Sequence, residues 1–291
     1  MAQLRQIKKR MVAVGTIRRI TKTMQMIATA KFTAAMSRAK ATRPYVERIR
    51  TMVAEVAAAA GDVTHPLLSP PRAATGRHLV LVLSSDRGLC GAYNGHILRT
   101  AMQQVRQIQA DGGTVALETS GKKAVAFFRF AKLAIDKRHA FGDRPKYDDV
   151  EVLAERYMKE FTAGQVDSVR VVFMKFISNS RQVPEVMQLL PLSMPATAEG
   201  GAKAGGGLYE FSPSSEELLG ELLPRSVKVS LFQAFMDAVV SENVMRMVAM
   251  KAASDNANGL GRSLRRSYNR ARQAKITTEL TEIVSGAAAL D

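Results

Sequence analysis

A glycine-rich stretch between a strand-like and a helix-like segment is the part of this sequence best suited to chemistry. It reads SSDRGLCGAYN, from Ser84 to Asn94, and it directly follows the apolar run 79–83. A strand, a glycine-rich turn and a helix in this order can hold a phosphate, because backbone N–H groups at the start of a helix attract anions. The stretch could therefore bind a nucleotide, or it could be only a tight turn.

The spacing within this stretch favours the turn. Gly88, Gly91 and Gly95 are three and four residues apart, which matches neither G-x-G-x-x-G nor G-x-x-x-x-G-K-[ST]. Asp86 would lie near the carboxyl end of the strand, where its charge would repel an anion. The two serines that open the stretch have no obvious histidine partner for acyl transfer. An α/β enzyme with a phosphate loop here stays a weaker alternative.

Histidine and cysteine, the usual metal and redox side chains, are few. The histidines are too scattered for metal-ligand spacing: His65, His78, His96 and His139. Cys90 is a single cysteine and cannot form an internal disulfide, which favours an intracellular protein. The sequence therefore predicts no metal site.

Residues 1–60 are predicted to form one long basic helix. They carry thirteen Lys and Arg residues against two acids, Glu47 and Glu55. Apolar residues recur in steps of 3, 4, 3, 3, 3, 4 and 3, which predicts a coiled-coil seam with a stammer, an extra three-residue step. The seam positions are Leu4, Ile7, Met11, Val14, Ile17, Ile20, Met24 and Ile27. Pro44 is expected to kink or split the helix.

The C-terminal end, residues 211–291, predicts the partner helix. Pro224 is a natural helix opener, and no proline follows it. The predicted seam is a strict heptad: Val227, Leu231, Ala234, Ala238, Ser241, Met245, Val248 and Ala252, resumed by Ile276, Leu280 and Ile283. The simplest closure is a long antiparallel coiled coil made from the two ends of the chain.

The middle of the chain predicts a Rossmann-like α/β domain, residues 75–210, inserted between these helices. Strands are expected at 78–84, 114–118, 133–138, 168–177 and 183–190, and helices at 94–109, 122–130 and 148–161. Alternating strands and helices are typical of a mostly parallel sheet, and the last two strands are expected to form a hairpin. The Gly/Ala-rich segment 197–207 is expected to be a flexible loop.

The charge points to an acidic partner. The chain has a formal net charge of +16 and a sequence pI near 10.2. A basic coiled coil that binds nucleic acid by counterion release is therefore an alternative function. Against it, the chain has no tryptophan, and residues 1–60 hold only Phe32 and Tyr45 as aromatic side chains. No stretch reaches the roughly 18 uninterrupted apolar residues of a membrane span.

Three segments, taken together, resemble the gamma subunits of F-type ATP synthases. They are IRRITKTMQMIATAKF (residues 17–32), SSDRGLCGAYN, and SENVMRMVAMKAASDNANGL followed by YNRARQAKITTELTEIVSGAAAL. The resemblance covers nearly the whole chain. It implies a central-stalk rotor subunit that couples proton-driven rotation of the c-ring to ATP synthesis or hydrolysis on the beta subunits. It also implies no cofactor, no catalytic site on this chain, one copy per complex, contact with alpha, beta, epsilon and the c-ring, and no nucleic acid partner.

The resemblance assigns roles to individual residues. Met24 matches a methionine that faces an acidic loop of a beta subunit. Arg272 and Gln273 match a pair that meets the beta catch loop, and Thr277 matches a neighbouring contact. The middle segment matches a structural turn and subunit contact, not a catalytic site, at Asp86, Arg87, Gly88 and Gly91.

The chain also departs from the family pattern. Gly15 precedes Thr16-Ile17, where relatives often have Asn-Thr, and the glycine-rich tract near 200–207 is longer than expected. A single cysteine excludes the light-linked thiol switch of chloroplast relatives. The N-terminus shows neither a secretory signal nor an organellar leader, which favours a bacterial protein, or else a mature organellar chain. The expected place is peripheral, on the cytoplasmic face of the inner membrane, with membrane contact only through the c-ring.

Overall fold

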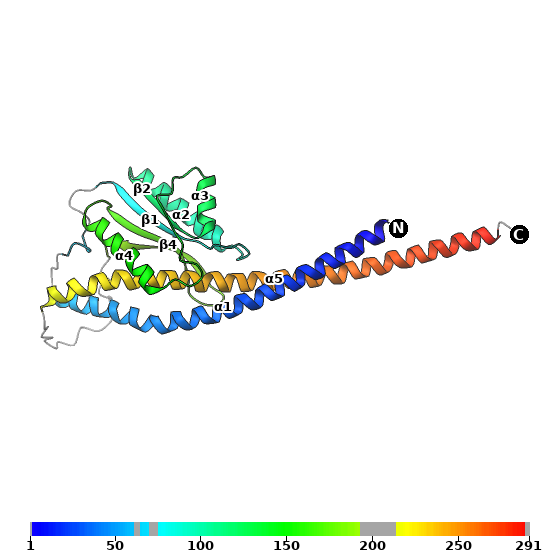
Figure 1. The fold of residues 1–291 in the computed structure, drawn as a ribbon, viewed down its shortest axis with the longest axis horizontal. Helices are drawn as coiled ribbons and strands as arrows, with labels where there is room; N and C mark the ends of the chain where they lie inside the picture. The colour runs from blue at the N-terminus through cyan, green and yellow to red at the C-terminus, as the bar shows by residue number, and fades with distance from the viewer. Residues whose placement is uncertain (1, 61–64, 70–74, 193–213, 289–291) are drawn as a thin grey trace. The chain divides into compact units, whose positions relative to one another are not determined.

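The computed structural model describes residues 2–60, 65–69, 75–192 and 214–288. Their elements are α1 (Ala2–Ala60), β1 (Arg77–Leu83), α2 (Tyr93–Ala110), β2 (Thr114–Ser120), α3 (Lys122–Phe130), β3 (Lys137–His139), α4 (Tyr147–Thr162), β4 (Ser168–Phe176), β5 (Gln182–Leu190) and α5 (Ser215–Ala288) (Figure 1). Two compact units result: a helical-pair unit, residues 1–30 and 246–291, and a sheet unit, residues 31–245. The predicted loop 197–207 lies outside the described residues.

The sheet unit contains one five-stranded sheet in the order β3-β2-β1-β4-β5. β1 is parallel to β2 and β4, β2 is parallel to β3, and β5 returns antiparallel to β4. The predicted α/β class with a mostly parallel sheet is therefore confirmed. The strand predicted at 133–138 is wrong in its first half, because the N–H of Leu133 instead bonds to the carbonyl of Phe128 at the end of α3 (2.9 Å).

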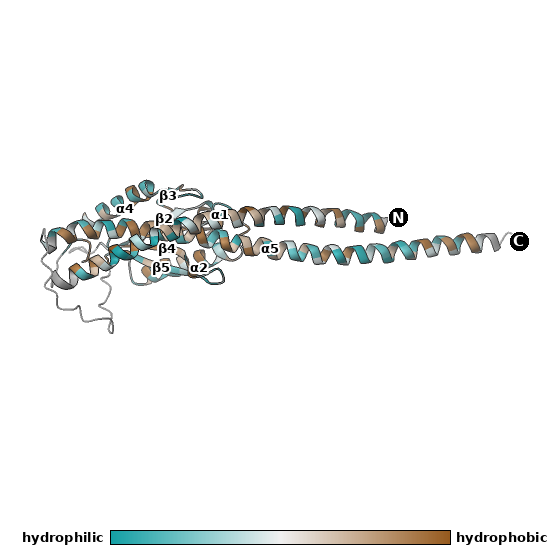
Figure 2. Ribbon diagram, turned by 90° about the horizontal axis from the view of Figure 1, so that it is seen from below, coloured by the Kyte–Doolittle hydropathy of each residue, from teal (hydrophilic) through white to brown (hydrophobic). Residues whose placement is uncertain are grey.

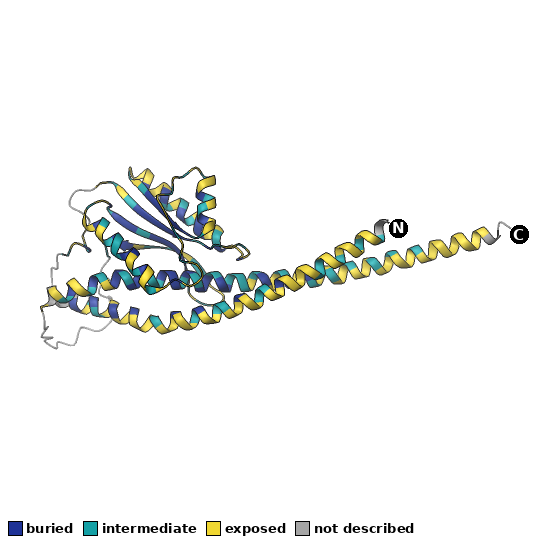
Figure 3. Ribbon diagram, viewed as in Figure 1, coloured by how far each residue is buried: buried dark blue, intermediate teal, exposed yellow. Residues whose placement is uncertain are grey.

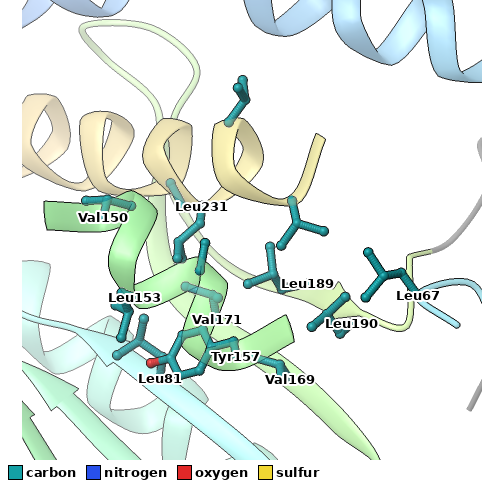
Figure 4. Packing of buried hydrophobic residues seen from close by; sticks show 14 of the residues in the cluster. Leu67, Leu81, Val150, Leu153, Tyr157, Val169, Val171, Leu189, Leu190 and Leu231 are labelled. Atoms are coloured by element: carbon teal, nitrogen blue, oxygen red, sulfur yellow. The ribbon is translucent and has the colours of Figure 1, made fainter. Parts of the chain in front are cut away.

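Both faces of the sheet are covered by helices. Alternate residues of a strand point to opposite faces, so Leu79 and Leu81 join the cluster on α4, α1 and α5, while Val80 and Val82 join the cluster on α2 and α3. Figure 4 shows the first cluster, with Tyr157 of α4 close to Leu81. A continuous apolar run such as 79–83 is expected when both faces of a strand are buried.

The long C-terminal helix begins earlier than predicted. α5 starts at Ser215, and Pro224 lies inside it. Proline in a helix interior costs about 3 kcal/mol, because it removes one backbone hydrogen bond and its ring meets the preceding turn. Leu219, Leu223 and Val227 are all buried around it. Burying such side chains contributes about 1.5–3 kcal/mol each, which is enough to keep the helix continuous.

In the sheet unit α1 packs against α5 through a strict heptad. Its buried and half-buried positions alternate by four and three residues: Phe32, Ala35, Ala39, Thr42, Val46, Ile49, Val53 and Val56. Ala35 and Ala39 meet Met236 and Val240 of α5 in one cluster. Arg50, further along α1, bonds to Ser230, which is earlier on α5. The two helices therefore run antiparallel, and α1 continues through the exposed Pro44 without a break.

In the helical-pair unit the predicted N-terminal seam is wrong after Val14. Ile17, Ile20 and Ile27 are exposed, whereas Thr21 (9% exposed) and Ala28 (1%) are buried. Figure 3 shows that exposed residues predominate along this part of α1. The positions facing α5 are instead Leu4, Ile7, Met11, Val14, Arg18, Thr21, Gln25 and Ala28, in strict steps of three and four. The predicted stammer is therefore absent from these described residues, because a cation and small side chains occupy the seam where the larger isoleucines were expected.

The predicted C-terminal seam also needs correction. In the sheet unit its residues from Val227 to Ser241 are buried, but Leu231, Ala234 and Ala238 belong to the cluster on the sheet. The heptad through Met236 and Val240 faces α1. In the helical-pair unit Val248 and Ala252 are exposed, and the buried or half-buried heptad is Met247, Met250, Ser254, Ala257, Gly261, Leu264, Tyr268, Ala271 and Lys275. The side chains of α5 facing α1 are thus offset from the predicted set.

Beyond Lys275, α5 extends past the start of α1. Ile276, Leu280 and Ile283, predicted to resume the seam, are exposed along this stretch. Figure 2 shows apolar and polar residues interleaved along the helix up to the end of the described chain. Among the described residues, no helix is long and apolar enough to cross a membrane.

Candidate functional site

The glycine-rich turn after β1 is held by its own polar side chains. Asn94 accepts a hydrogen bond from the backbone N–H of Ser85 (3.1 Å) and donates to Ser85 Oγ (2.8 Å) and to Cys90 Sγ (3.2 Å). Ser85 Oγ in turn donates to the carbonyl of Arg87 (2.7 Å). Ser85 and Cys90 are buried. These bonds hold the shape of the turn from inside, because its buried polar side chains bond to one another and to its backbone.

The turn also fixes the start of α3. Asp86 Oδ1 accepts a hydrogen bond from the N–H of Lys122 (3.1 Å), and Ser84 Oγ accepts one from the N–H of Ala124 (2.9 Å). A carboxylate at a helix N-terminus is stabilised by the helix dipole. Asp86 thus occupies the position at α3 that a bound phosphate would need. Gly91 adopts a left-handed backbone (φ 60), while Gly88 lies close to the Lys123 side chain.

Replacing Asp86 with alanine should weaken the seating of α3. Loss of a side-chain acceptor at a helix start costs about 1 kcal/mol of unfolding free energy. Asp86→Asn keeps an oxygen at the same place and should retain most of that stability. Urea unfolding of the two variants and the unchanged chain measures the difference. Equal stability of all three chains would show that this bond contributes nothing.

The residues matched to rotor contacts lie at two separate places in the helical-pair unit. Met24 is half-buried on α1, beside the seam, and Arg272, Gln273 and Thr277 are exposed on α5. Arg18 bonds to Asn258 across the pair (3.0 Å). Because the helices are antiparallel, Met24 and Arg272 lie about 20 residues apart along the pair, or about 30 Å at 1.5 Å per residue. The structure does not bring them together.

An exposed apolar stripe on α1 was missed by sequence reasoning. Ile17, Ile20 and Ile27 lie three and seven residues apart, so they share one face of α1, and they point to solvent beside the seam. Val12 is exposed as well. The correct seam runs through Thr21 and Ala28. Because these side chains are small or polar, they add little to the apolar periodicity from which a seam is predicted. Exposed apolar side chains in this number are typical of a surface that meets another protein.

A buried carboxylate was also missed. Glu118 on β2 is 2% exposed, and its Oε2 accepts hydrogen bonds from His139 Nε2 (2.7 Å), Arg156 Nη2 (2.5 Å) and the Tyr157 hydroxyl (2.8 Å). Burial raises the pKa of Glu118, but these hydrogen bonds and the charge of Arg156 outweigh burial and lower the pKa to about 2. Burial and the nearby Glu118 charge raise the pKa of Tyr157. The group joins β2 to α4 and β3 as a charged structural cluster.

Comparison with known proteins gives matches over the whole chain. A protein-family model described as ATP synthase matches residues 3–290. The ATP synthase gamma chain of Rhodopirellula baltica is 43% identical over 296 residues, and that of Rhizobium rhizogenes is 38% identical over 294 residues. Each alignment covers 100% of both chains.

Solved structures share the fold. A chain of Euglena gracilis mitochondrial ATP synthase (OSCP/F1/c-ring, rotational state 3) aligns with a TM-score of 0.66 at 17% identity, covering 99% of this chain and 95% of that chain. A chain from the rotor of the same enzyme in rotational state 1 gives 0.61 at 15% identity, covering 94% and 99%. Given the full-length family match and relatives at 38–43% identity, the chain belongs to the family of ATP synthase gamma chains.

Proposed function

We propose that this chain is the central-stalk rotor subunit of an F-type ATP synthase, with no catalytic site of its own. Family membership carries the proposal, and the helical-pair unit supports it physically. That unit presents exposed isoleucines on α1 and the exposed cations Arg262, Arg265, Arg266, Arg270 and Arg272 on α5. Such a surface suits a surrounding protein rich in carboxylates. Family membership leaves the nucleic-acid-binding alternative without support.

The proposed mechanism is mechanical. Rotation of a c-ring turns the gamma chain inside a ring of alpha and beta subunits, and its asymmetric surface presents a different face to each beta subunit in turn. A binding site changes affinity when a contact stabilises one of its conformations over another. Arg272 and Gln273 would make hydrogen bonds to one beta subunit at a time, and bonds from a guanidinium to a carboxylate are among the stronger ones.

The proposed partners follow from the same family. One gamma chain would contact alpha and beta through the helical-pair unit, and epsilon and the c-ring through the sheet unit. The turn at Asp86, Arg87, Gly88 and Gly91 would serve as structure and subunit contact. The complex would place the chain peripherally, on the cytoplasmic face of the inner membrane.

Co-purification tests this function. The chain would be tagged in its own cells and extracted in mild detergent, and its partners would be identified while ATP hydrolysis is assayed. We expect a large complex with alpha, beta and epsilon subunits that hydrolyses ATP. Recovery of the chain alone, or with nucleic acid that high salt removes, would contradict the proposal.

Replacing Met24 with lysine should uncouple the proposed motor. A new cation beside the seam would form an extra bond to an acidic loop of beta, and that bond would have to break at each step. We expect ATP hydrolysis to continue while ATP-driven proton pumping in sealed vesicles falls.

The matched control is Met26→Lys, which adds the same charge to the same helix about 200° around its axis. Met26 is exposed, so this variant should fold and pump nearly normally. Unchanged pumping in the Met24 variant, or an equal loss in both variants, would contradict the placement of Met24.

A further inference from the structure

A basic cavity in the sheet unit lies between α1, α5 and the loop that joins β3 to α4. Its volume is about 460 Å³. Three cations line it, Lys31 and Arg38 from α1 and Arg144 from the loop, together with one acid, Asp143, which pairs with Lys31. The lining therefore carries a net charge of about +2. The loop is fixed in place, because Phe141 packs edge-on against Phe235 of α5 at 4.7 Å between ring centroids.

A buried amide in the same cavity lacks a hydrogen-bond partner. Asn243 of α5 lines the cavity and is only 5% exposed. Its Nδ2 donates to the carbonyl of Val239 on its own helix (2.8 Å), but no donor within the described chain reaches its Oδ1. A 180° flip of the amide would exchange Oδ1 and Nδ2, and it would break the hydrogen bond from Nδ2 to Val239. Leaving a buried acceptor unpaired costs about 1–3 kcal/mol, so a ligand with a hydrogen-bond donor would be stabilised here.

The cations and the unpaired acceptor together select one kind of anion. The guanidinium of Arg38 is anchored by a hydrogen bond from Nε to the carbonyl of Ala34 (3.3 Å), a bond that does not involve its two terminal amino groups. Arg144 is exposed, and no ion pair joins it to an acid among the described residues. Guanidinium groups bind the oxygens of phosphate well. The acceptor on Asn243 then requires that the anion keep a proton of its own.

We propose that this cavity is a binding site for free hydrogen phosphate. Arg38 and Arg144 hold its charged oxygens, and its P–OH donates to Asn243 Oδ1. Hydrogen phosphate keeps one P–OH at neutral pH. Sulfate has none, and a phosphomonoester loses its last P–OH above its second pKa of about 6. Both of these anions would leave Asn243 Oδ1 unpaired. The site rests on the geometry of the sheet unit and does not depend on the proposed rotor function.

Calorimetric titration of the full-length chain at constant ionic strength tests the site. At about pH 8, phosphate and sulfate carry similar charge, so they differ mainly in the P–OH. We expect phosphate to bind with a Kd tighter than about 10 mM, and sulfate and glycerol phosphate to bind at least about tenfold more weakly. Absence of phosphate binding, or equal affinity for the three anions, would overturn the proposal.

Three variants locate the site. Arg144→Gln should weaken phosphate binding about ten- to a hundredfold through the loss of a charge-assisted hydrogen bond. Arg48→Gln removes an exposed cation of α1 that does not line the cavity, and should leave binding unchanged. Asn243→Leu should remove the preference for phosphate over sulfate. Equal weakening by Arg144→Gln and Arg48→Gln would show general attraction to a basic chain and would overturn the proposal. If the Asn243 variant fails to fold, the proposal is still tested by the two arginine variants and by the preference of the unchanged chain for phosphate over sulfate.

Discussion

Replacing Gly121 with alanine should destabilise the chain by about 3–5 kcal/mol, enough to prevent folding of a marginally stable domain. Gly121 joins β2 to α3 with a φ of 97, a backbone conformation that is essentially restricted to glycine. A Cβ here would lie 2.1 Å from the Ser84 carbonyl oxygen and 2.6 Å from its carbon. Both atoms are backbone at the end of β1, so they cannot move aside without disturbing the sheet. Urea unfolding, or the soluble yield of the variant, measures the loss.

Gly95→Ala is the matched control for this substitution. Gly95 is exposed inside α2, and a Cβ there would have no atom within 4 Å. Alanine should stabilise the helix by about 0.5–1 kcal/mol. If Gly121→Ala were as stable as Gly95→Ala, the close approach of Gly121 to Ser84 would not limit folding.

Replacing Glu118 with glutamine should cost about 2–3 kcal/mol at pH 7, and the cost should vanish in acid. Glutamine mimics the protonated carboxyl group. The pKa of Glu118 is about 2 in the folded chain, against 4.5 as its ordinary value. Because the folded pKa is the lower one, ionised Glu118 stabilises the fold above about pH 4.5, and this stabilisation is lost as the pH falls toward about 2. Unfolding free energies of both chains across this pH range test the expectation.

Glu185→Gln is the control for the glutamate substitution. Glu185 pairs with Lys175 at 2.8 Å, but both side chains are substantially exposed. Surface pairs of this kind contribute about 0–1 kcal/mol. A gap between wild type and Glu118→Gln that stays constant from pH 7 to 2 would show that the charge of Glu118 is not the cause.

The sheet could be predicted from the sequence because its signals are local. The apolar run 79–83 determines one strand, and the hairpin pattern near residue 180 determines two. The observed strand ends differ from the predicted ones by one or two residues in most cases. The strand before Lys137 was wrong because β3 is a three-residue edge strand. Its place is determined by pairing with β2 and by the Glu118–His139 bond, neither of which is a local property.

The helical seams could not be predicted correctly, although the antiparallel pair itself is confirmed. Apolar periodicity shows which positions of a helix are hydrophobic, but not which neighbour each of them meets. In the sheet unit α5 is buried on two sides, one against the sheet and one against α1. The apolar pattern predicted that the side with Leu231 faces α1, whereas that side belongs to the cluster on the sheet. On α1, small seam residues such as Ala28 allow close approach of the helices but give a weak apolar signal. Large isoleucines such as Ile20 give a strong apolar signal although they are exposed.

Some of the site residues could be named from the sequence, and others could not. Arg272, Gln273 and Thr277 were assigned by resemblance, and the structure places them exposed on one part of α5, where their contacts stay a prediction. Glu118 had no signal beyond being a lone acid in an apolar strand, because its partners come from β3 and α4. The unpaired oxygen of Asn243 likewise depends on how three separate segments meet.

The two buried sides of α5 have a mechanical consequence within the sheet unit. Met236 and Val240 engage α1, Leu231 and Ala234 engage the cluster on the sheet, and the carbonyl of Ala238 accepts a hydrogen bond from the Tyr93 hydroxyl at 3.2 Å. A twist of α5 about its own axis would have to break both interfaces at once. Torque applied to the sheet would therefore turn α5 together with it, because this segment of the helix is held on two sides.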